Sequence, residues 1–245
     1  MRSDNRLDGT MRKDHENEEI TRTEDDITQN LAKAALEIGA VKLDPINPTR
    51  WASGYHMPIY NDNRKFLFHP GYRRLVIDGF MEVIRENGFE PEVVAGTSTA
   101  GIPYGALLAE RLDAPFVYVR DRPKDHGLMN RIEGIDAEDD LGGRTVILIE
   151  DLISTGKSSL KAVNAIREAE GSIDTCVSIF DYGFDKSYKM FSEQGCDKIT
   201  LSDYDTLVGI ANQTGYITDE EMSLLTEWRQ DPYGWGEKHG FPKRS

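Results

Sequence analysis

The middle of the chain alternates short apolar segments with amphipathic ones, and this alternation limits the possible fold more than any other feature. The run Val146–Ile149 places four apolar side chains in succession, as expected for a strand buried on both faces of a parallel sheet. Strands are expected at 93–96, 116–120, 145–150 and 175–180, and helices at 101–112 and 158–170. Strands that alternate with helices predict a doubly wound α/β fold, a mainly parallel sheet flanked by helices.

The segment before this alternating region divides into a polar tail and two helices. Residues 1–26 contain nine Asp or Glu and five Lys or Arg with almost no apolar side chains, so folding could not bury enough surface to offset its entropy cost. We therefore expect a disordered acidic tail over 1–26 and a single domain over 27–245. Amphipathic helices should run from Ile27 to Gly39 and from about Tyr72 to Asn87.

The charge of the chain excludes several classes of function. Its 29 basic and 43 acidic residues give a formal net charge of −14, which repels a nucleic-acid backbone or an anionic membrane surface. No apolar run approaches the roughly 18 residues of a transmembrane helix, and the acidic N-terminal segment is unlike a targeting peptide. We expect a cytoplasmic protein with no nucleic-acid or membrane partner, in which Cys176 and Cys196 are reduced structural thiols.

A turn suited to phosphate binding follows the strand expected at 145–150. Ser154, Thr155, Gly156 and Ser158 stand between this strand and the next helix. Backbone N–H groups, hydroxyls and the helix N-terminus would all face an anion there. The turn is not a nucleotide P-loop, because that motif requires a glycine at the position of Asp151.

Two carboxylates, Glu150 and Asp151, stand at the entrance of this turn. They would repel a phosphate unless they face another part of the ligand, such as the vicinal hydroxyls of a ribose, so a sugar 5-phosphate fits the pattern. An isolated acidic pair is more often a solvated strand end, but the strand, turn and helix around this pair favour a ligand site. In doubly wound sheets ligands bind beyond the carboxyl ends of the strands, so the loops after Gly96, Arg120 and Glu150 should hold the chemistry.

The segment from Arg120 to Gly134 carries a second set of charges. Arg120, Arg122, Lys124 and His126 stand between two expected strands in a context rich in Gly, Pro and Asp. Such a loop can close over a pyrophosphate and neutralise it, each charge-assisted hydrogen bond contributing roughly 1.5 to 3 kcal/mol. Judged alone, the same charges would also suit a solvated surface loop.

The run IEDLISTG from Ile149 to Gly156 resembles the phosphoribosyl pyrophosphate (PRPP) motif of type I phosphoribosyltransferases. Further segments are similar to the orotate phosphoribosyltransferases, in the family's order and over about residues 30–232: Gly39–Leu43, Trp51–Gly54, Pro58–Tyr60, Asp62–Arg64, Thr99–Pro103, Lys124–Gly127, Ile132–Gly134 and Leu201–Leu207. The resemblance implies the type I phosphoribosyltransferase fold with a small hood from the N-terminal segments. It also implies transfer of a phosphoribosyl group from PRPP to orotate in UMP biosynthesis, Mg²⁺ held mainly by PRPP with no direct protein ligand, and a homodimer with shared active sites.

The resemblance assigns roles to individual positions. Glu150 and Asp151 would hold the ribose hydroxyls and favour positive charge on the ribose, and residues 155–158 would anchor the 5-phosphate. Ser154 stands where the family contacts orotate. The implied catalytic residues are Arg120, Lys124, His126 and Asp151. The implied PRPP-binding residues are Arg120, Lys124, His126, Glu150, Asp151, Leu152, Ile153, Ser154, Thr155, Gly156, Lys157 and Ser158.

Several positions depart from the family pattern. His56 and Met57 stand where relatives usually have lysine and serine, and Asp121, Lys157 and Asp181 replace a basic residue, a glycine and a threonine. Two interpretations of His56 stay open. As a substrate contact it would replace the lysine when protonated, with a pH dependence between about 6 and 7; otherwise it is a neutral, hydrogen-bonded side chain. Two other functions stay open as well, a phosphoribosyltransferase for another base and a non-catalytic PRPP sensor that regulates a partner.

Overall fold

A six-stranded sheet forms the centre of the computed structural model, which describes residues 24–51, 53–121, 131–136 and 139–243. The strand order is β10-β9-β8-β5-β6-β7. The strands are β5 (Val93–Thr97), β6 (Phe116–Val119), β7 (Ile132–Glu133), β8 (Val146–Ile153), β9 (Thr175–Asp181) and β10 (Asp197–Asp203). All neighbours are parallel except β6 and β7, so the predicted mainly parallel sheet is confirmed.

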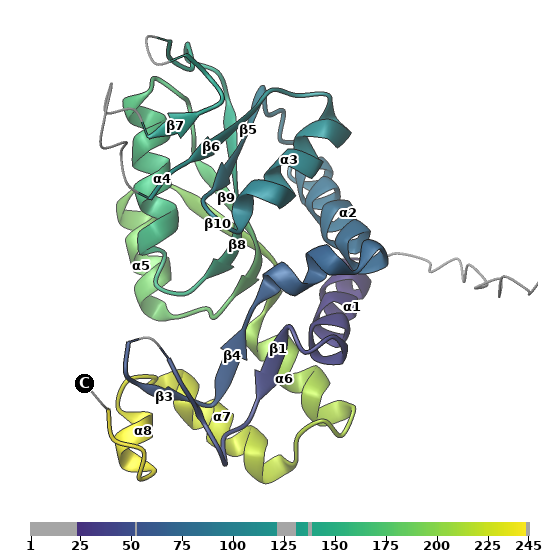
Figure 1. The fold of residues 1–245 in the computed structure, drawn as a ribbon, viewed down its shortest axis with the longest axis vertical. Helices are drawn as coiled ribbons and strands as arrows, with labels where there is room; N and C mark the ends of the chain where they lie inside the picture. Colours follow the sequence, from purple (N-terminus) through teal and green to yellow (C-terminus); the bar gives the residue numbers. More distant parts are fainter. Residues whose placement is uncertain (1–23, 52, 122–130, 137–138, 244–245) are drawn as a thin grey trace, which may run out of the picture.

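Helices cover both faces of this sheet (Figure 1). One face carries α1 (Glu24–Glu37), α2 (Pro70–Glu86) and α3 (Gly101–Leu112), and the other carries α4 (Lys157–Glu168) and α5 (Asp185–Glu193). Alternation along β8 explains this, because Ile147 and Ile149 join the core beneath α1–α3 while Val146 and Leu148 join the core beneath α4. The doubly wound architecture is therefore confirmed. No helix in the described ranges is long and apolar enough to cross a membrane.

The ends of two elements differ from the expected ones. Helix α1 begins at Glu24, so the last three residues of the segment predicted as a disordered tail are helical, and the rest of that segment lies outside the described residues. Strand β8 continues to Ile153, past its expected end at Glu150. The acidic pair therefore lies within the strand, not in the loop after it.

The two cysteines lie on the α4 side of the sheet. Cys176 and Cys196 are both buried and free. Burial raises the pKa of both thiols, that of Cys196 to about 11. Neither is therefore activated as a thiolate, in keeping with the structural role predicted for them.

A smaller hood lies beside the carboxyl ends of the central strands (Figure 1). Two antiparallel strand pairs contribute to it, β1 (Val41–Leu43) with β4 (Ile59–Asn61) and β2 (Thr49–Arg50) with β3 (His56–Met57). The elements of the fold not yet named are the 3-10 helix η1 (Asn63–Phe68) and the helices α6 (Tyr204–Gln213), α7 (Asp219–Gln230) and α8 (Trp235–Lys238). The indole N–H of Trp228 in α7 donates to Met57 Sδ at 3.1 Å, so the predicted N-terminal hood also takes in C-terminal helices.

Candidate active site

The turn after β8 has the geometry of the predicted phosphate cradle. Residues 154–156 bend between the end of β8 and Lys157, where α4 begins. Gly156 has a φ of +78°, and a Cβ there would lie 2.7 Å from the ring of Phe191, so this turn requires glycine. In this described segment no side chain caps the N-terminus of α4. Its first backbone N–H groups therefore remain open toward an anion.

The two carboxylates at the end of β8 have different surroundings, because successive residues of a strand point to opposite faces. Glu150 is 5% exposed, and its carboxylate accepts hydrogen bonds from Thr97 Oγ1 at 2.6 Å and Ser159 Oγ at 2.9 Å. Asp151 is half-buried, and the amide of Asn63 in η1 donates to its backbone oxygen at 2.6 Å. Glu150 is thus enclosed by protein hydroxyls and Asp151 is the more accessible of the two. The ribose contact predicted for both carboxylates stays a prediction.

Helix α3 approaches β8 closely at this acidic pair. A Cβ at Gly101, the first residue of α3, would lie 2.4 Å from the carbonyl oxygen of Ile149 and 2.5 Å from Thr97 Oγ1. Only glycine allows this approach, which keeps the hydroxyl of Thr97 within reach of Glu150.

Burial changes the titration of this acidic pair. Desolvation raises the pKa of Glu150 to about 7, and the neighbouring Asp151 carboxylate acts in the same direction, while hydrogen bonds from Thr97 and Ser159 oppose the rise. Desolvation also raises the pKa of Asp151. Between the ordinary value of 4.5 and about 7, the folded protein retains a proton on Glu150 that the unfolded chain has released. Rising pH in this window therefore lowers the free energy of unfolding.

The Glu150→Gln variant tests this effect. An amide keeps both hydroxyl partners but does not titrate, so the variant should lack the loss of stability between about pH 4.5 and 7, which amounts to roughly 3 kcal/mol for a single group. Urea unfolding at pH 5 and pH 8 measures it. The free energy of unfolding of E150Q minus that of the wild type should be larger at pH 8 than at pH 5. Glu110→Gln at an exposed position of α3 is the matched control. A stability difference for E150Q that is equal at the two pH values would contradict the assignment.

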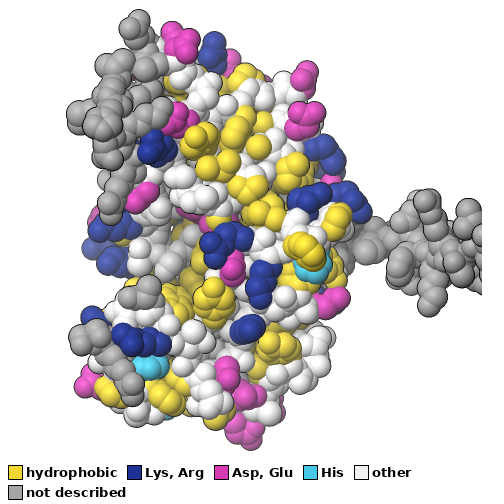
Figure 2. Space-filling view, viewed as in Figure 1, with side chains coloured by type: hydrophobic (Ala, Val, Ile, Leu, Met, Phe, Trp, Pro, Cys, Tyr) yellow, Lys and Arg dark blue, Asp and Glu magenta, His cyan; other side chains and the backbone are white. Residues whose placement is uncertain are grey.

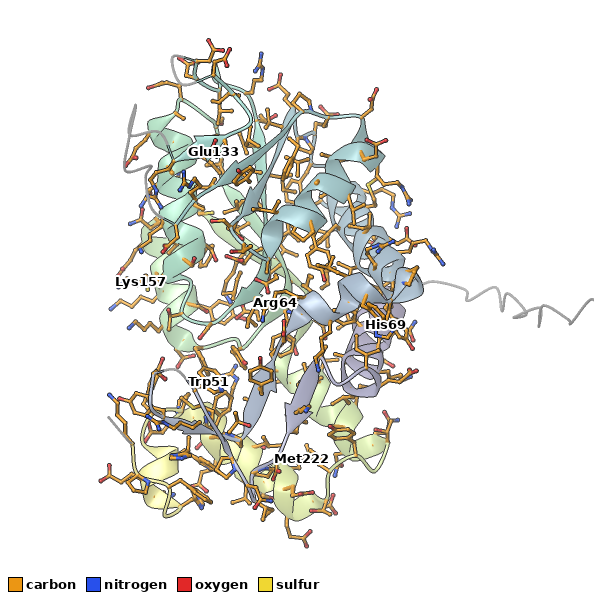
Figure 3. The ribbon with its side chains drawn as sticks, in the orientation of Figure 1. Trp51, Arg64, His69, Glu133, Lys157 and Met222 are labelled. Atoms are coloured by element: carbon orange, nitrogen blue, oxygen red, sulfur yellow. The ribbon has the colours of Figure 1, made fainter. Side chains whose placement is uncertain are left out.

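Two of the predicted basic residues, Arg120 and Lys157, lie within the described ranges. Arg120 follows β6, and its guanidinium donates to Glu133 Oε1 on β7 at 3.2 Å. Lys157 is exposed at the first position of α4 and extends outward (Figure 3). Lys124 and His126 lie outside the described residues, so their roles stay predictions.

His56 lies in β3, directly opposite Arg50 of β2. Its ring centroid is 6.0 Å from that of Phe241, and its backbone oxygen lies close to Gly236. Its Nδ1 is buried and has no hydrogen-bond partner within the described part of the chain. The structure therefore packs His56 against the C-terminal segment, and no hydrogen bond to Nδ1 supports the second interpretation either.

A cavity of about 360 Å³ lies between the hood and the carboxyl ends of β8 and β9. It is lined by Arg50, Trp51, Ser53, Tyr60, Asn61, Leu152 and Tyr182. Figure 2 shows the surface hollowed between the sheet and the hood, with Lys and Arg side chains on both sides of the hollow. Among the predicted site residues, Leu152 is the one that lines this cavity, and Ser154 lies in the turn beyond it.

Two fixed aromatic rings form walls of this cavity. The Trp51 indole N–H donates to the carbonyl of Ile59 at 2.9 Å, and the ring centroids of Trp51 and Tyr182 are 5.9 Å apart. Tyr182 is 1% exposed because it packs within an aromatic cluster with Phe180, Phe184, Tyr204 and Trp228. Rigid aromatic walls with few polar groups suit a planar heterocycle.

Sequence reasoning did not assign this cavity. Trp51 and Tyr60 lay in segments of the resemblance, but Arg50, Asn61 and Tyr182 received no role. Tyr182 directly follows β9, so the rule that ligands bind beyond strand carboxyl ends could have identified it. Asp181, which stands where relatives usually have a threonine, is the last residue of β9; its carboxylate pairs with Lys198 of β10, and the next residue, Tyr182, lines the cavity.

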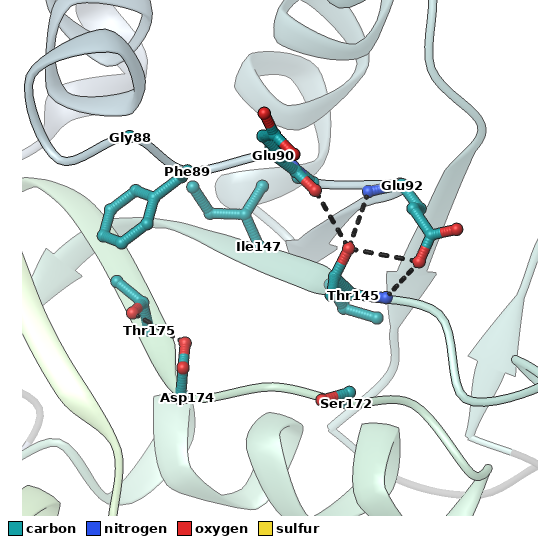
Figure 4. Close-up of a pocket in the computed structure, with 11 residues that line it drawn as sticks. Gly88, Phe89, Glu90, Glu92, Thr145, Ile147, Ser172, Asp174 and Thr175 are labelled. Carbon is teal, nitrogen blue, oxygen red and sulfur yellow. Dashed lines mark hydrogen bonds between the residues drawn. The ribbon is translucent and has the colours of Figure 1, made fainter.

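A larger cavity of about 570 Å³ lies at the opposite, amino-terminal edge of the sheet (Figure 4). Its polar groups bind one another: Thr145 Oγ1 donates to the Glu90 carbonyl at 3.0 Å, and the Thr145 N–H donates to Glu92 Oε2 at 2.8 Å. None of the buried side-chain atoms without a hydrogen-bond partner in the described ranges lines it. In this fold class ligands bind at the other edge, so size does not make this cavity the active site.

Comparison with known proteins agrees with this geometry. The model of the phosphoribosyl transferase domain matches residues 69–216, which contain the sheet and the cradle. The chain therefore belongs to the phosphoribosyltransferase family, a group of glycosyltransferases.

Its relatives define the branch of that family. The chain is 44% identical over 211 residues to the orotate phosphoribosyltransferase of Streptococcus pneumoniae, which covers 86% of this chain and 99% of the relative. The crystal structure of orotate phosphoribosyltransferase from Aeropyrum pernix is 26% identical, with a TM-score of 0.64 over 77% of this chain and 99% of that one. Within the family, this chain is a member of the orotate phosphoribosyltransferases.

A further solved structure shares the fold. The orotate phosphoribosyltransferase of Mycobacterium tuberculosis, solved in complex with PRPP, has a TM-score of 0.56 at 20% identity, covering 74% of this chain and 98% of that one.

Proposed function

We propose that this protein transfers the 5-phosphoribosyl group of PRPP to orotate and releases pyrophosphate, giving orotidine 5′-phosphate for UMP biosynthesis. The observation that carries the proposal is the position of Asp151. Asp151 directly follows the buried core of β8 and directly precedes Leu152, which lines the aromatic cavity, and the turn to the open N-terminus of α4 begins at the end of the same strand. A sugar phosphate and a planar base can thus meet beside one carboxylate.

The proposed reaction breaks one bond and forms another at the anomeric carbon of the ribose. Pyrophosphate leaves with the electron pair of its C–O bond. N1 of orotate loses its proton, which passes to the pyrophosphate or to solvent, and supplies the electron pair for the new C–N bond. Positive charge therefore develops on the ribose in the transition state. Asp151 is placed to stabilise this charge, and the backbone N–H groups of residues 156–158 to hold the 5-phosphate.

Neutralisation of the leaving group is assigned to the basic segment and to Mg²⁺. We propose that Lys124 and His126, with Arg120, bind the pyrophosphate, and that either Lys124 or His126 assists its protonation. Phosphate oxygens are ligands that Mg²⁺ prefers, and the Asp151 carboxylate is an oxygen donor of the same chemistry. We propose that Mg²⁺ is held mainly by the oxygens of PRPP. When bound, Mg²⁺ would neutralise charge on the departing pyrophosphate.

The proposal includes a cytoplasmic homodimer with shared active sites. The segment with Lys124 and His126 would then act on PRPP bound by the partner subunit. Mixing two inactive variants, one changed at Lys124 and one at Asp151, tests this sharing: mixed dimers should recover part of the activity. No recovery after subunit exchange would contradict shared sites.

A steady-state assay tests the activity itself. Purified protein with PRPP and Mg²⁺ should consume orotate and release stoichiometric pyrophosphate, with much lower turnover of uracil and purine bases. Preference for another base would assign a different phosphoribosyltransferase activity. Tight PRPP binding by the folded protein without turnover of any base would instead assign the sensor function.

A further inference from the structure

The base that the proposed reaction uses carries a negative charge. Orotate differs from uracil by a carboxylate on the ring carbon next to N1, so a site that prefers orotate must stabilise an anion at the edge of a flat ring. An uncharged aromatic cavity cannot do this, because taking a carboxylate out of water without a partner is costly. The carboxylate therefore needs a partner at the wall of the cavity lined by Trp51 and Tyr182, and a cation is the partner that also compensates its charge.

Arg50 meets this requirement. Of the seven described residues that line the cavity, Arg50 is the one with a charged side chain. The others supply aromatic or aliphatic walls, a hydroxyl and the Asn61 amide. Arg50 is also exposed, so its guanidinium can reach a ligand without losing a buried position.

The position of Arg50 is fixed by the hairpin that carries it. Arg50 pairs with His56 across β2 and β3, and the N–H of Trp51 donates to the carbonyl of Tyr55 at 2.9 Å. The next residue, Trp51, forms a wall of the cavity. The ring wall and the cation are therefore neighbours on one constrained strand end.

The same ladder places His56 directly opposite Arg50. Relatives usually have a substrate-facing lysine at this position, whereas here His56 packs against Phe241 and does not line the cavity. Its cross-strand partner Arg50 does line it. Of this cross-strand pair, the residue that lines the cavity is therefore the arginine.

We infer that Arg50 binds the carboxylate of orotate and thereby determines the preference of this enzyme for orotate over uncharged pyrimidines. The inference rests on the proposed function and adds a specificity-determining residue to it. A guanidinium matches a carboxylate through two parallel N–H···O bonds, while the base ring lies against Trp51 and Tyr182. The contact concerns the base alone, so PRPP binding does not depend on it.

The Arg50→Met and Arg50→Lys variants test the inference. Loss of a charge-assisted hydrogen bond to the carboxylate should raise the KM for orotate in R50M by about 10- to 100-fold. The KM for PRPP should stay unchanged, and the ratio of kcat/KM between orotate and uracil should fall by a similar factor. R50K keeps the positive charge but cannot form the two parallel hydrogen bonds, so its KM for orotate should lie between those of R50M and the wild type. Arg74→Met, at an exposed arginine of α2, should match the wild type.

Equilibrium binding separates this inference from the proposed function. Titration calorimetry of orotate into wild type and R50M should show a weakening that matches the change in KM. An unchanged orotate affinity in R50M, or equal losses for orotate and PRPP, would overturn the role of Arg50 while wild-type activity stands. A wild type that neither binds nor converts orotate would instead overturn the proposed function, and the role of Arg50 with it.

Discussion

Asp151→Asn is expected to lower kcat by about 100-fold or more while the KM for PRPP changes little. Asparagine has the shape of aspartate and can still hydrogen-bond to ribose hydroxyls, so ground-state binding persists. What it lacks is the negative charge that opposes the cation developing on the ribose. An interaction that strengthens only in the transition state appears in kcat.

The effect of this substitution on stability distinguishes a catalytic loss from a damaged fold. Burial raises the pKa of Asp151, which means that the folded protein disfavours its charged form. A neutral amide removes this cost, so D151N should be at least as stable as the wild type at neutral pH. A variant that is slower but no less stable has lost chemistry and kept its structure.

Two other variants complete this experiment. Glu150→Gln should retain far more turnover than D151N, because the Glu150 carboxylate is enclosed by Thr97 and Ser159. Asp113→Asn should match the wild type, since Asp113 is exposed at the C-terminal end of α3 in a left-handed conformation that asparagine tolerates. If D151N turned over orotate at the wild-type rate, the charge of Asp151 would have no part in the reaction.

The central strands could be predicted from the sequence because the pattern that identifies a buried strand is local. Each of β5, β8 and β9 is a run of apolar residues buried on both faces, so a few neighbouring side chains identify it. Strand β10 was not predicted, because Asp197–Asp203 mixes polar and apolar residues at the edge of the sheet, where a strand needs burial on one side only. The hood strands are two or three residues long and depend on partners distant in the chain.

The phosphate-binding turn could be predicted from the sequence and the base cavity could not, again because one is local in the chain and the other is not. Residues 149–156 are contiguous, so the phosphate site could be recognised as a motif. The base cavity brings together Trp51 and Tyr60 with Tyr182, which only tertiary packing can do. Glu150 and Asp151 point to opposite faces because β8 continues past Glu150 to Ile153. The sequence did not predict this, because no residue pattern in 151–153 indicates where the strand ends.

Asp181 shows how a substituted position can act on the site indirectly. Its side chain forms an ion pair with Lys198, and the two side chains are 4% and 5% exposed. The same carboxylate accepts the N–H of Gly183 at 2.7 Å, and the ammonium of Lys198 lies 3.5 Å from the ring centroid of Tyr188. The pair thus fixes both ends of the turn that holds Tyr182 against the base cavity.

Breaking this pair is expected to cost about 3 to 5 kcal/mol of stability, because Lys198 would remain buried without its counter-charge. Asp181→Asn tests this by urea unfolding, since the amide oxygen can still accept from Gly183 and the loss reports on charge. Adding Lys198→Met removes the stranded ammonium, so the double variant should recover most of the loss.

Glu193→Gln is the matched control for the double variant. It breaks the exposed Lys189–Glu193 pair on α5 and should change stability by less than about 0.5 kcal/mol. If D181N cost no more than E193Q, or if the double variant were as unstable as D181N, the ion pair would not stabilise this turn. Recovery in the double variant would instead show that a neutral pair can replace the charged one. The threonine usual at this position could then be introduced together with an apolar residue at Lys198 without loss of the Tyr182 wall, and the KM for orotate would stay close to that of the wild type.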